Sequence, residues 1–152
     1  MAVVAEATRA GRGLAGVDAR VCFGGPTRGT VRHDAVVVIA DGLAPEAAAA
    51  RLIHLRMHVG DGLHRYPELG VACAPQIEAA IAAEARAIVA EIEACDELRC
   101  AAAPYSFAAA VLAMAADQRA SQVIGILRAE PVEDGLRALI GGYRARCEAA
   151  NR

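Results

Sequence analysis

Residues 52–64 of this chain read LIHLRMHVGDGLH, and they hold three of its four histidines: His54, His58 and His64. His54 and His58 stand four residues apart. On a helix, this spacing directs both imidazoles from one face, one turn apart, as a bidentate metal clamp requires. So short a motif also arises by chance. The alternative is a structural pair, in which one ring hydrogen-bonds a backbone carbonyl and the other borders a cavity.

The residues on either side predict that this stretch lies on a helix. The segment Asp41–Glu46 combines a turn, a proline suited to a first helical turn, and an acid favourable at a helix N-terminus. Gly60 and Gly62 are typical of a helix end. We therefore expect a helix over about residues 45–59. Its alanines and leucines are distributed over almost the whole circumference of the helix, which indicates a central helix rather than a surface one.

Two apolar runs precede the expected helix. Val17–Phe23 and Ala35–Ala40 are typical of strands, and the second contains four consecutive β-branched residues. A glycine-rich connection over residues 24–29 joins them. We therefore expect a small N-terminal antiparallel β-sheet, formed by a strand pair within residues 17–40.

Helices are expected over most of the remaining chain. A long one is predicted over about residues 76–100, because isoleucines recur there at helical spacing. They are Ile77, Ile81, Ile88 and Ile92. Pro104 opens a further helix that runs to about residue 130, and Pro131 separates it from a last one, so C-terminal helices are expected over residues 104–149. The sequence thus predicts a single α+β domain over residues 1–152 that is mainly α-helical.

The composition argues against several classes of function. A net charge of −2 with dispersed arginines provides no basic field for a phosphate backbone, so we expect no nucleic-acid partner. No apolar run approaches the roughly 20 residues of a membrane-spanning helix. The first residues lack the basic and long apolar regions of a signal peptide. We therefore expect a cytoplasmic protein with no membrane partner.

The cysteines and serines suggest no chemistry of their own. The five cysteines form no C-x2-C pair, and an odd number in an unsecreted chain is typical of reduced thiols. We expect neither a disulfide framework nor a four-cysteine zinc site. The two serines, Ser106 and Ser121, lie outside any G-x-S-x-G setting, which excludes serine hydrolysis.

A metal site built on the histidine pair needs a third protein ligand, and the sequence offers two. His64 follows His58 by six residues, after a Gly60-Asp61-Gly62 turn that could return the chain to the metal. Glu84 would come from the 76–100 helix, as in zinc enzymes whose third ligand is a carboxylate on a separate helix.

Glu84 also has an alternative role. It falls among the isoleucines of its helix, where an unpaired carboxylate would cost several kcal/mol. Arg51 or Arg56 could neutralise it in a structural ion pair, and Glu91, at the edge of the same stripe, could compete for either role.

The segment His54–His58 matches both histidines of the zinc-protease array H-E-x-x-H but has Leu55 at its general-base glutamate. Over roughly residues 17–100, the chain resembles small bacterial zincin-like metallopeptidase domains. The matching segments are Val36–Ile39, residues 52–58 and Ala83–Ala87. The resemblance implies a divalent metal such as zinc, with His54, His58 and Glu84 as ligands. Because Leu55 occupies the catalytic position, it implies the fold and the metal but not turnover.

We therefore expect a catalytically degenerate zincin-like protein, a pseudoenzyme that can retain zinc and that binds or regulates a protein partner. One alternative is an active metallopeptidase-like hydrolase with a displaced general base. The acids considered for that base are Asp61, Glu68, Glu78 and Glu91. Another alternative is a metal-free helical interaction module in which Glu84 meets an arginine. The alanine-rich C-terminal helices could also pair with a second copy and form a homo-oligomer.

Overall fold

The computed structural model describes residues 8–14, 16–25, 29–129 and 134–152. The elements along the chain are α2 (Arg9–Gly13), β1 (Arg20–Gly25), β2 (Thr30–Val31), β3 (Val36–Ala40), α3 (Pro45–Gly60), the 3-10 helix η1 (Leu63–Arg65), α4 (Cys73–Glu97), α5 (Ala108–Leu112), α6 (Arg119–Arg128) and α7 (Asp134–Ala150).

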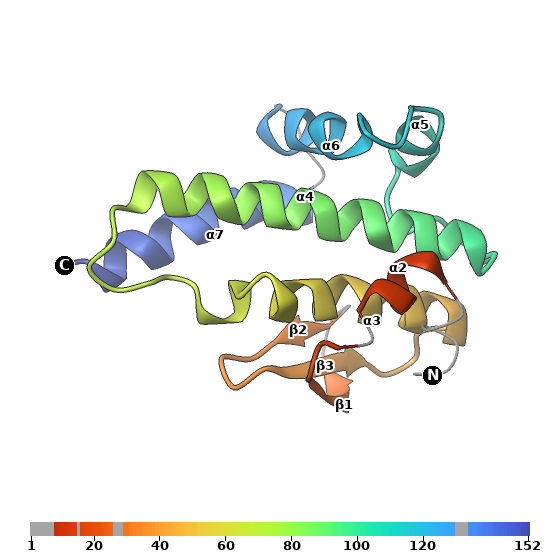
Figure 1. Cartoon of the computed structure of the whole chain (residues 1–152), viewed down its shortest axis with the longest axis horizontal. Coiled ribbons are helices and arrows are strands. Elements are labelled where there is room, and N and C mark those ends of the chain that lie inside the picture. The colour runs from red at the N-terminus through yellow and green to blue at the C-terminus, as the bar shows by residue number, and fades with distance from the viewer. Residues whose placement is uncertain (1–7, 15, 26–28, 130–133) are drawn as a thin grey trace.

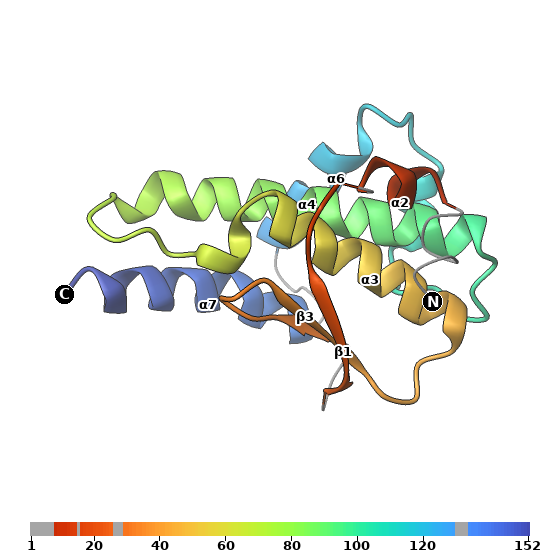
Figure 2. The ribbon, with the colours of Figure 1, turned by 60° about the horizontal axis from the view of Figure 1, so that its bottom comes forward.

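The elements stack in layers (Figure 1). The small sheet covers one side of α3, and α4 runs antiparallel to α3 on its other side. Helix α7 lies alongside α4, and α5 and α6 pack on the side of α4 away from the sheet (Figures 1 and 2). The predicted α+β fold, mainly helical with a small sheet near the N-terminus, is confirmed.

The sheet is mixed, which corrects the expected antiparallel pair. Its strand order is β1-β3-β2, with β1 parallel to β3 and β2 antiparallel to it. The prediction joined the two long runs directly and missed the two-residue strand β2. In the structure β2 forms the hairpin with β3, through a turn in which Ala35 adopts a left-handed φ of 59°. The opposite edge of β3 is therefore left to β1.

A glycine allows the sheet to lie close to α3. Gly29, just before β2, has a φ of +128°, and a Cβ atom there would lie 2.8 Å from the carbonyl oxygen of Val38 and 3.0 Å from Cδ1 of Leu55. A side chain at this position would separate the sheet from α3 at the histidine segment. The start of β2 is thus packed directly against Leu55.

The predicted central helix is confirmed, with bounds 45–60 in place of 45–59. Pro45 occupies its first turn, and most of its side chains facing β3 and α4 are buried. Arg56 leaves the helix on another side and donates hydrogen bonds from Nη2 to the carbonyl oxygens of Leu14 and Val17, at 2.6 and 2.8 Å. Arg56 thereby holds the N-terminal segment against α3.

Helix α4 is buried on two faces, which corrects the position assigned to Glu84. The isoleucines Ile81, Ile88 and Ile92 pack against α5 and α6, as a predicted apolar stripe should. Glu84 and Glu91, seven residues apart, instead lie with buried alanines on the face towards α3. The sequence pattern indicated only the isoleucine stripe. The second buried face consists of alanines and two acids, which do not form a recognisable apolar pattern.

The C-terminal helices differ in part from the prediction. The helix expected over residues 104–130 is divided into α5 and α6. The side chain of Arg119 donates to the carbonyl oxygens of Leu112 and Met114, which lie at and just beyond the end of α5, so the break leaves these groups hydrogen-bonded. Helix α7 continues through Gly141 and Gly142 without a break.

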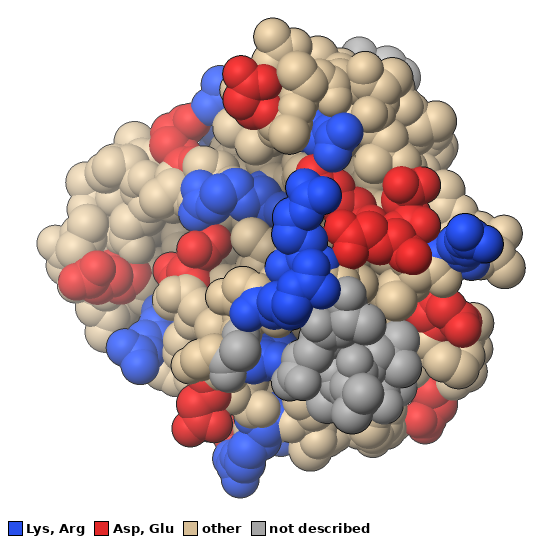
Figure 3. Space-filling view, turned by 45° about the vertical axis from the view of Figure 1, so that its right-hand side comes forward, with Lys and Arg blue, Asp and Glu red and all other residues tan. Residues whose placement is uncertain are grey.

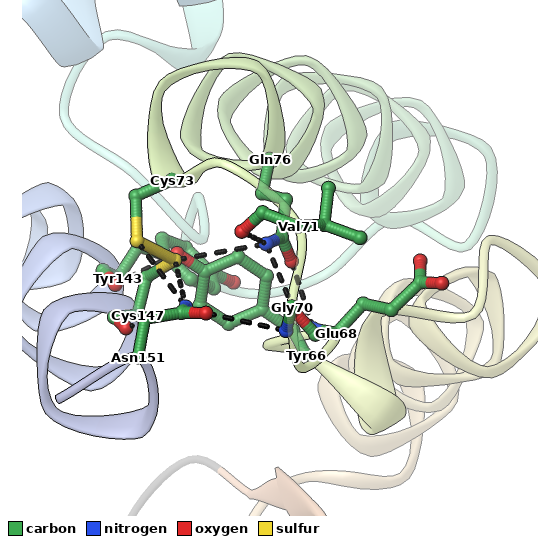
Figure 4. The surroundings of a disulfide bond; sticks show 9 residues. All are labelled: Tyr66, Glu68, Gly70, Val71, Cys73, Gln76, Tyr143, Cys147 and Asn151. Carbon is green, nitrogen blue, oxygen red and sulfur yellow. Dashed lines mark hydrogen bonds between the residues drawn. A yellow bond between two sulfur atoms is a disulfide. The ribbon is translucent and has the colours of Figure 1, made fainter.

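Two disulfides contradict the expected reduced thiols. Cys73 at the start of α4 is bonded to Cys147 on α7 (Figure 4), and Cys95 is bonded to Cys100 just beyond α4. The prediction failed because cysteine spacing does not show which helices lie side by side. Since disulfides are rare in the cytosol, the cysteines no longer support a cytoplasmic location. Among the described helices, none is both long and apolar enough to cross a bilayer.

The disulfides predict a specific labelling pattern. Alkylation of the denatured, unreduced protein should modify one cysteine, the exposed Cys22, whereas all five should react after reduction. Intact-protein mass spectrometry measures the number of labels. A Cys22→Ser control should take up no label before reduction. Uptake of five labels without reductant would show that neither disulfide forms.

Candidate metal centre

His54 and His58 lie in the interior, between α3 and α4. Their exposed fractions are 1% and 8%. The Nε2 atoms of the two rings are 2.9 Å apart, and the rings meet edge to face. The spacing of four residues on a helix therefore produces the convergence that the sequence predicted.

Glu84 meets both histidines from α4. Its Oε1 lies 3.3 Å from Nε2 of His54, and its Oε2 lies 3.1 Å from Nε2 of His58. The exposed fraction of Glu84 is 5%. Each of the three residues offers a ligand atom, and these atoms all lie within 4.8 Å of one another. This buried group could hold a metal ion.

Glu91 contacts the far side of the His54 ring. Its Oε2 lies 2.9 Å from Nδ1 of His54, although the ring N–H is not aligned for a regular hydrogen bond. The same oxygen accepts from Arg51 Nη1 at 3.0 Å and from the hydroxyl of Tyr105 at 2.7 Å. A carboxylate beside Nδ1 favours the proton on that nitrogen, which leaves the Nε2 lone pair of His54 directed at Glu84.

The charge states of the group suit a cation. Burial favours the neutral form of Glu84, but its contacts with His54 and His58 outweigh burial and hold its pKa well below the usual range. Burial also lowers the pKa of His58, and the neighbouring Glu84 only partly opposes this. At neutral pH the site therefore presents a carboxylate and a neutral imidazole, the forms that bind metals.

Glu91 is ionised as well. Burial raises its pKa, but contacts with His54, Arg51 and Tyr105 lower it to about 2. Unlike Glu84, Glu91 has a guanidinium as a direct partner.

Tyr143 completes the polar surroundings of Glu84 from α7. Its hydroxyl donates to Oε2 of Glu84 at 3.0 Å. Burial and the adjacent carboxylate of Glu84 raise the pKa of Tyr143, so its hydroxyl keeps its proton and acts as a donor. The carbonyl of Tyr143 accepts from the hydroxyl of Tyr66 at 2.7 Å, and the Cys73–Cys147 disulfide lies one turn further along α7 (Figure 4). The role of Tyr66 is thus to anchor α7.

The alternative partners considered for Glu84 are engaged elsewhere. Arg51 pairs with Glu91, and Arg56 binds the backbone near the N-terminus. Within the described part of the chain, no arginine forms an ion pair with Glu84. The metal-free hypothesis expected such a pair.

His64, the other predicted third ligand, lies on η1 and outside the three-residue group. It lines a cavity of about 220 Å³ into which His58 and Glu84 also open. The turn at Gly62, with a φ of 74°, brings His64 back towards α3, but Glu84, and not His64, belongs to the group that could hold a metal.

The position that corresponds to the glutamate of the H-E-x-x-H array is apolar in the structure. Leu55 has an exposed fraction of 2%, and it lines the same cavity as His58. The acids suggested as replacements lie elsewhere: Asp61 pairs with Arg86, Glu78 pairs with Arg128, Glu68 lines a different cavity and Glu91 contacts the far side of His54. Among the described residues, Glu84 is the one carboxylate that lines the 220 Å³ cavity.

A larger cavity of about 670 Å³ lies away from this group. It is bordered by the segment after α3 and by the first half of α4, including Asp61, Tyr66 and Arg86. None of the three residues that could hold a metal lines this larger cavity.

Comparison with protein families, curated proteins and solved structures finds nothing that matches this chain. Sequence reasoning identified His54, His58 and Glu84 but missed the part played by Tyr143 and by Glu91 at the Nδ1 atom of His54. The seven-residue spacing of Glu84 and Glu91 was the available signal for the latter, because it places both on one helix face.

The contact with Glu91 predicts a measurable effect on metal affinity. Glu91→Gln should weaken zinc binding by about 10-fold to 100-fold, because the His54 ring would lose the carboxylate that orients it. Competition with a chromophoric chelator measures the affinity. Glu97→Gln, on the same helix but outside the ligand group, is the matched control and should bind zinc as the wild type does. Equal affinities in all three proteins would contradict this role for Glu91.

Proposed function

We propose that this chain is a zincin-like protein that binds zinc through His54, His58 and Glu84 and lacks peptidase activity. The observation that carries the proposal is the convergence of two imidazole nitrogens and one carboxylate, at 2.9 to 3.3 Å from one another, in a buried site. Two histidines and one glutamate form a ligand set of catalytic-type zinc sites, which keep a fourth position for water or another ligand.

The arrangement of lone pairs supports a cation. With the proton of His54 on Nδ1, its Nε2 faces the carboxylate of Glu84 and the Nε2 of His58 without a hydrogen of its own to share. The donors left for Glu84 are then the Nε2–H tautomer of His58 and the hydroxyl of Tyr143, and a metal ion in place of the His58 proton would be bound by Nε2 of both rings and by the carboxylate. A bound zinc would neutralise Glu84 and, as a Lewis acid, polarise whatever occupied its fourth position.

The surroundings support binding rather than hydrolysis. Glu84 is held by Tyr143, and Leu55 presents a hydrocarbon side chain where a zincin has its base. A general base must lie within hydrogen-bonding reach of the reacting water, and the other acids considered do not line the cavity. The order of elements also fits the resemblance, with a sheet, a helix bearing both histidines and a later helix bearing the glutamate.

A metal at this position would act on the fold. It would join α3 to α4, and through the hydrogen bond from Tyr143 it would also fix α7. Because the ligands come from separate helices, the free energy of binding adds to folded-state stability. In this proposal the protein has a binding or regulatory role, and the metal holds the three helices in one arrangement.

Metal content tests the proposal directly. Protein purified without a histidine tag should contain about one equivalent of zinc, and the double variant His54→Ala, His58→Ala should contain none, because two of three ligands are gone. Elemental analysis measures this. Glu84→Gln should lower the affinity more than about 100-fold, beyond the effect expected for a residue that only supports a ligand.

His33→Ala, which changes an exposed histidine outside the ligand group, is the control and should retain full zinc content. Circular dichroism of each variant establishes that it folds. A folded wild type that takes up no zinc, even when zinc is supplied, would overturn the proposal.

Absence of turnover is the second expectation. The zinc-loaded wild type should cleave unfolded casein no faster than the double histidine variant, because no base is placed at the site. Leu55→Glu should raise cleavage by about 10²-fold to 10⁴-fold, the usual contribution of a positioned acid or base. Leu55→Gln controls for introducing a polar side chain at a buried position. Zinc-dependent cleavage by the wild type would instead favour the hydrolase with a displaced base.

A further inference from the structure

Two arginines, Arg51 and Arg146, line the 220 Å³ cavity next to the candidate metal centre. We call it the arginine pocket and define it by Arg51, His58, His64, Glu84, Tyr143 and Arg146. It opens onto two of the three metal-ligand residues, His58 and Glu84. A metal held by these residues would therefore border this pocket.

The charge of the pocket is unbalanced. Arg146 is exposed and forms no ion pair with any described residue. Its guanidinium lies over the rings of Tyr66 and Tyr143, at 5.5 and 4.8 Å from their centroids, and its Nε donates to the carbonyl of Gly142. The stacking on two rings holds the guanidinium at the pocket wall.

The remaining charges do not cancel that of Arg146. Arg51 is paired with Glu91, which lies behind the pocket. Glu84 is the pocket's carboxylate, and a divalent cation at the ligand group would more than offset its charge. The loaded pocket is thus net positive and is suited to an anion.

Size and apolar surface limit the anion further. Aliphatic side chains complete the wall: Val31 from β2, Leu55 from α3, Leu63 from η1 and Leu139 from α7. A volume of about 220 Å³ is smaller than the roughly 300 to 1,000 Å³ typical of pockets for drug-sized ligands. The pocket therefore fits one anionic group that carries a short hydrocarbon portion.

We propose that the arginine pocket binds a small organic carboxylate, whose oxygens pair with the guanidinium of Arg146 while its hydrocarbon portion contacts Leu55. A planar carboxylate matches the fork of a guanidinium, and the apolar wall disfavours a fully hydrated inorganic anion. The inference rests on the proposed function, because without the metal Glu84 would repel the ligand. The carboxylate belongs either to a free short-chain acid or to the C-terminus of a peptide.

Calorimetric titration of the zinc-loaded protein tests the inference. The probes are butyrate, N-acetyl-alanyl-alanine, the C-terminal amide of that dipeptide, and inorganic phosphate. At least one of the two carboxylates should bind, whereas the amide and phosphate should not. Butyrate binding alone identifies a free acid as the ligand type, and dipeptide binding identifies a peptide C-terminus.

Variants of α7 supply the controls. Arg146→Gln should weaken carboxylate binding about 10-fold or more, the usual effect of losing a charge-assisted hydrogen bond. Arg144→Gln, a matched change on the same helix, lies outside the pocket and should leave it unchanged. Zinc content is measured on every sample. Lack of zinc overturns the proposed function and this inference together, whereas normal zinc content without Arg146-dependent carboxylate binding, or with preferred binding of phosphate, overturns only the pocket.

Discussion

The burial of two carboxylates on one face of α4 is the constraint around which this protein is arranged. Each buried charge costs several kcal/mol unless it is paired and hydrogen-bonded. Glu91 meets this requirement with Arg51, Tyr105 and His54. Glu84 has two histidines and a tyrosine but no guanidinium. That asymmetry between two otherwise similar acids is the physical reason to place a cation at Glu84.

The rest of the fold serves to bring α3 and α4 together at this point. Small alanine side chains on both helices, including Ala49 and Ala94, fill the core that they share with the sheet. Gly29 lets the sheet approach Leu55, and the Cys73–Cys147 disulfide fastens α7 near Tyr143. Acidic and basic side chains lie side by side on the face shown in Figure 3, without one broad field of either sign.

The features that could be predicted are those set by residues close together in the sequence. The bounds of α3 and the positions of β1 and β3 followed local patterns within a few residues. The direction of β1 did not, because it depends on the two-residue strand β2, which has no periodicity of its own. The disulfides were missed for a related reason, since Cys73 and Cys147 are 74 residues apart and meet only because α7 lies along α4.

The sequence by itself determined the histidine pair, because the four-residue spacing on a helix sets where both imidazoles point, and it determined that an apolar residue, Leu55, lies between them. It also determined a mainly helical fold, since hydrophobic periodicity is a local property. Only the tertiary structure decided that Glu84 rather than His64 joins the two histidines, that Arg51 serves Glu91, and that Arg146 borders the same cavity. These outcomes depend on which helix faces pack together, and separations between helices are not encoded in any single segment.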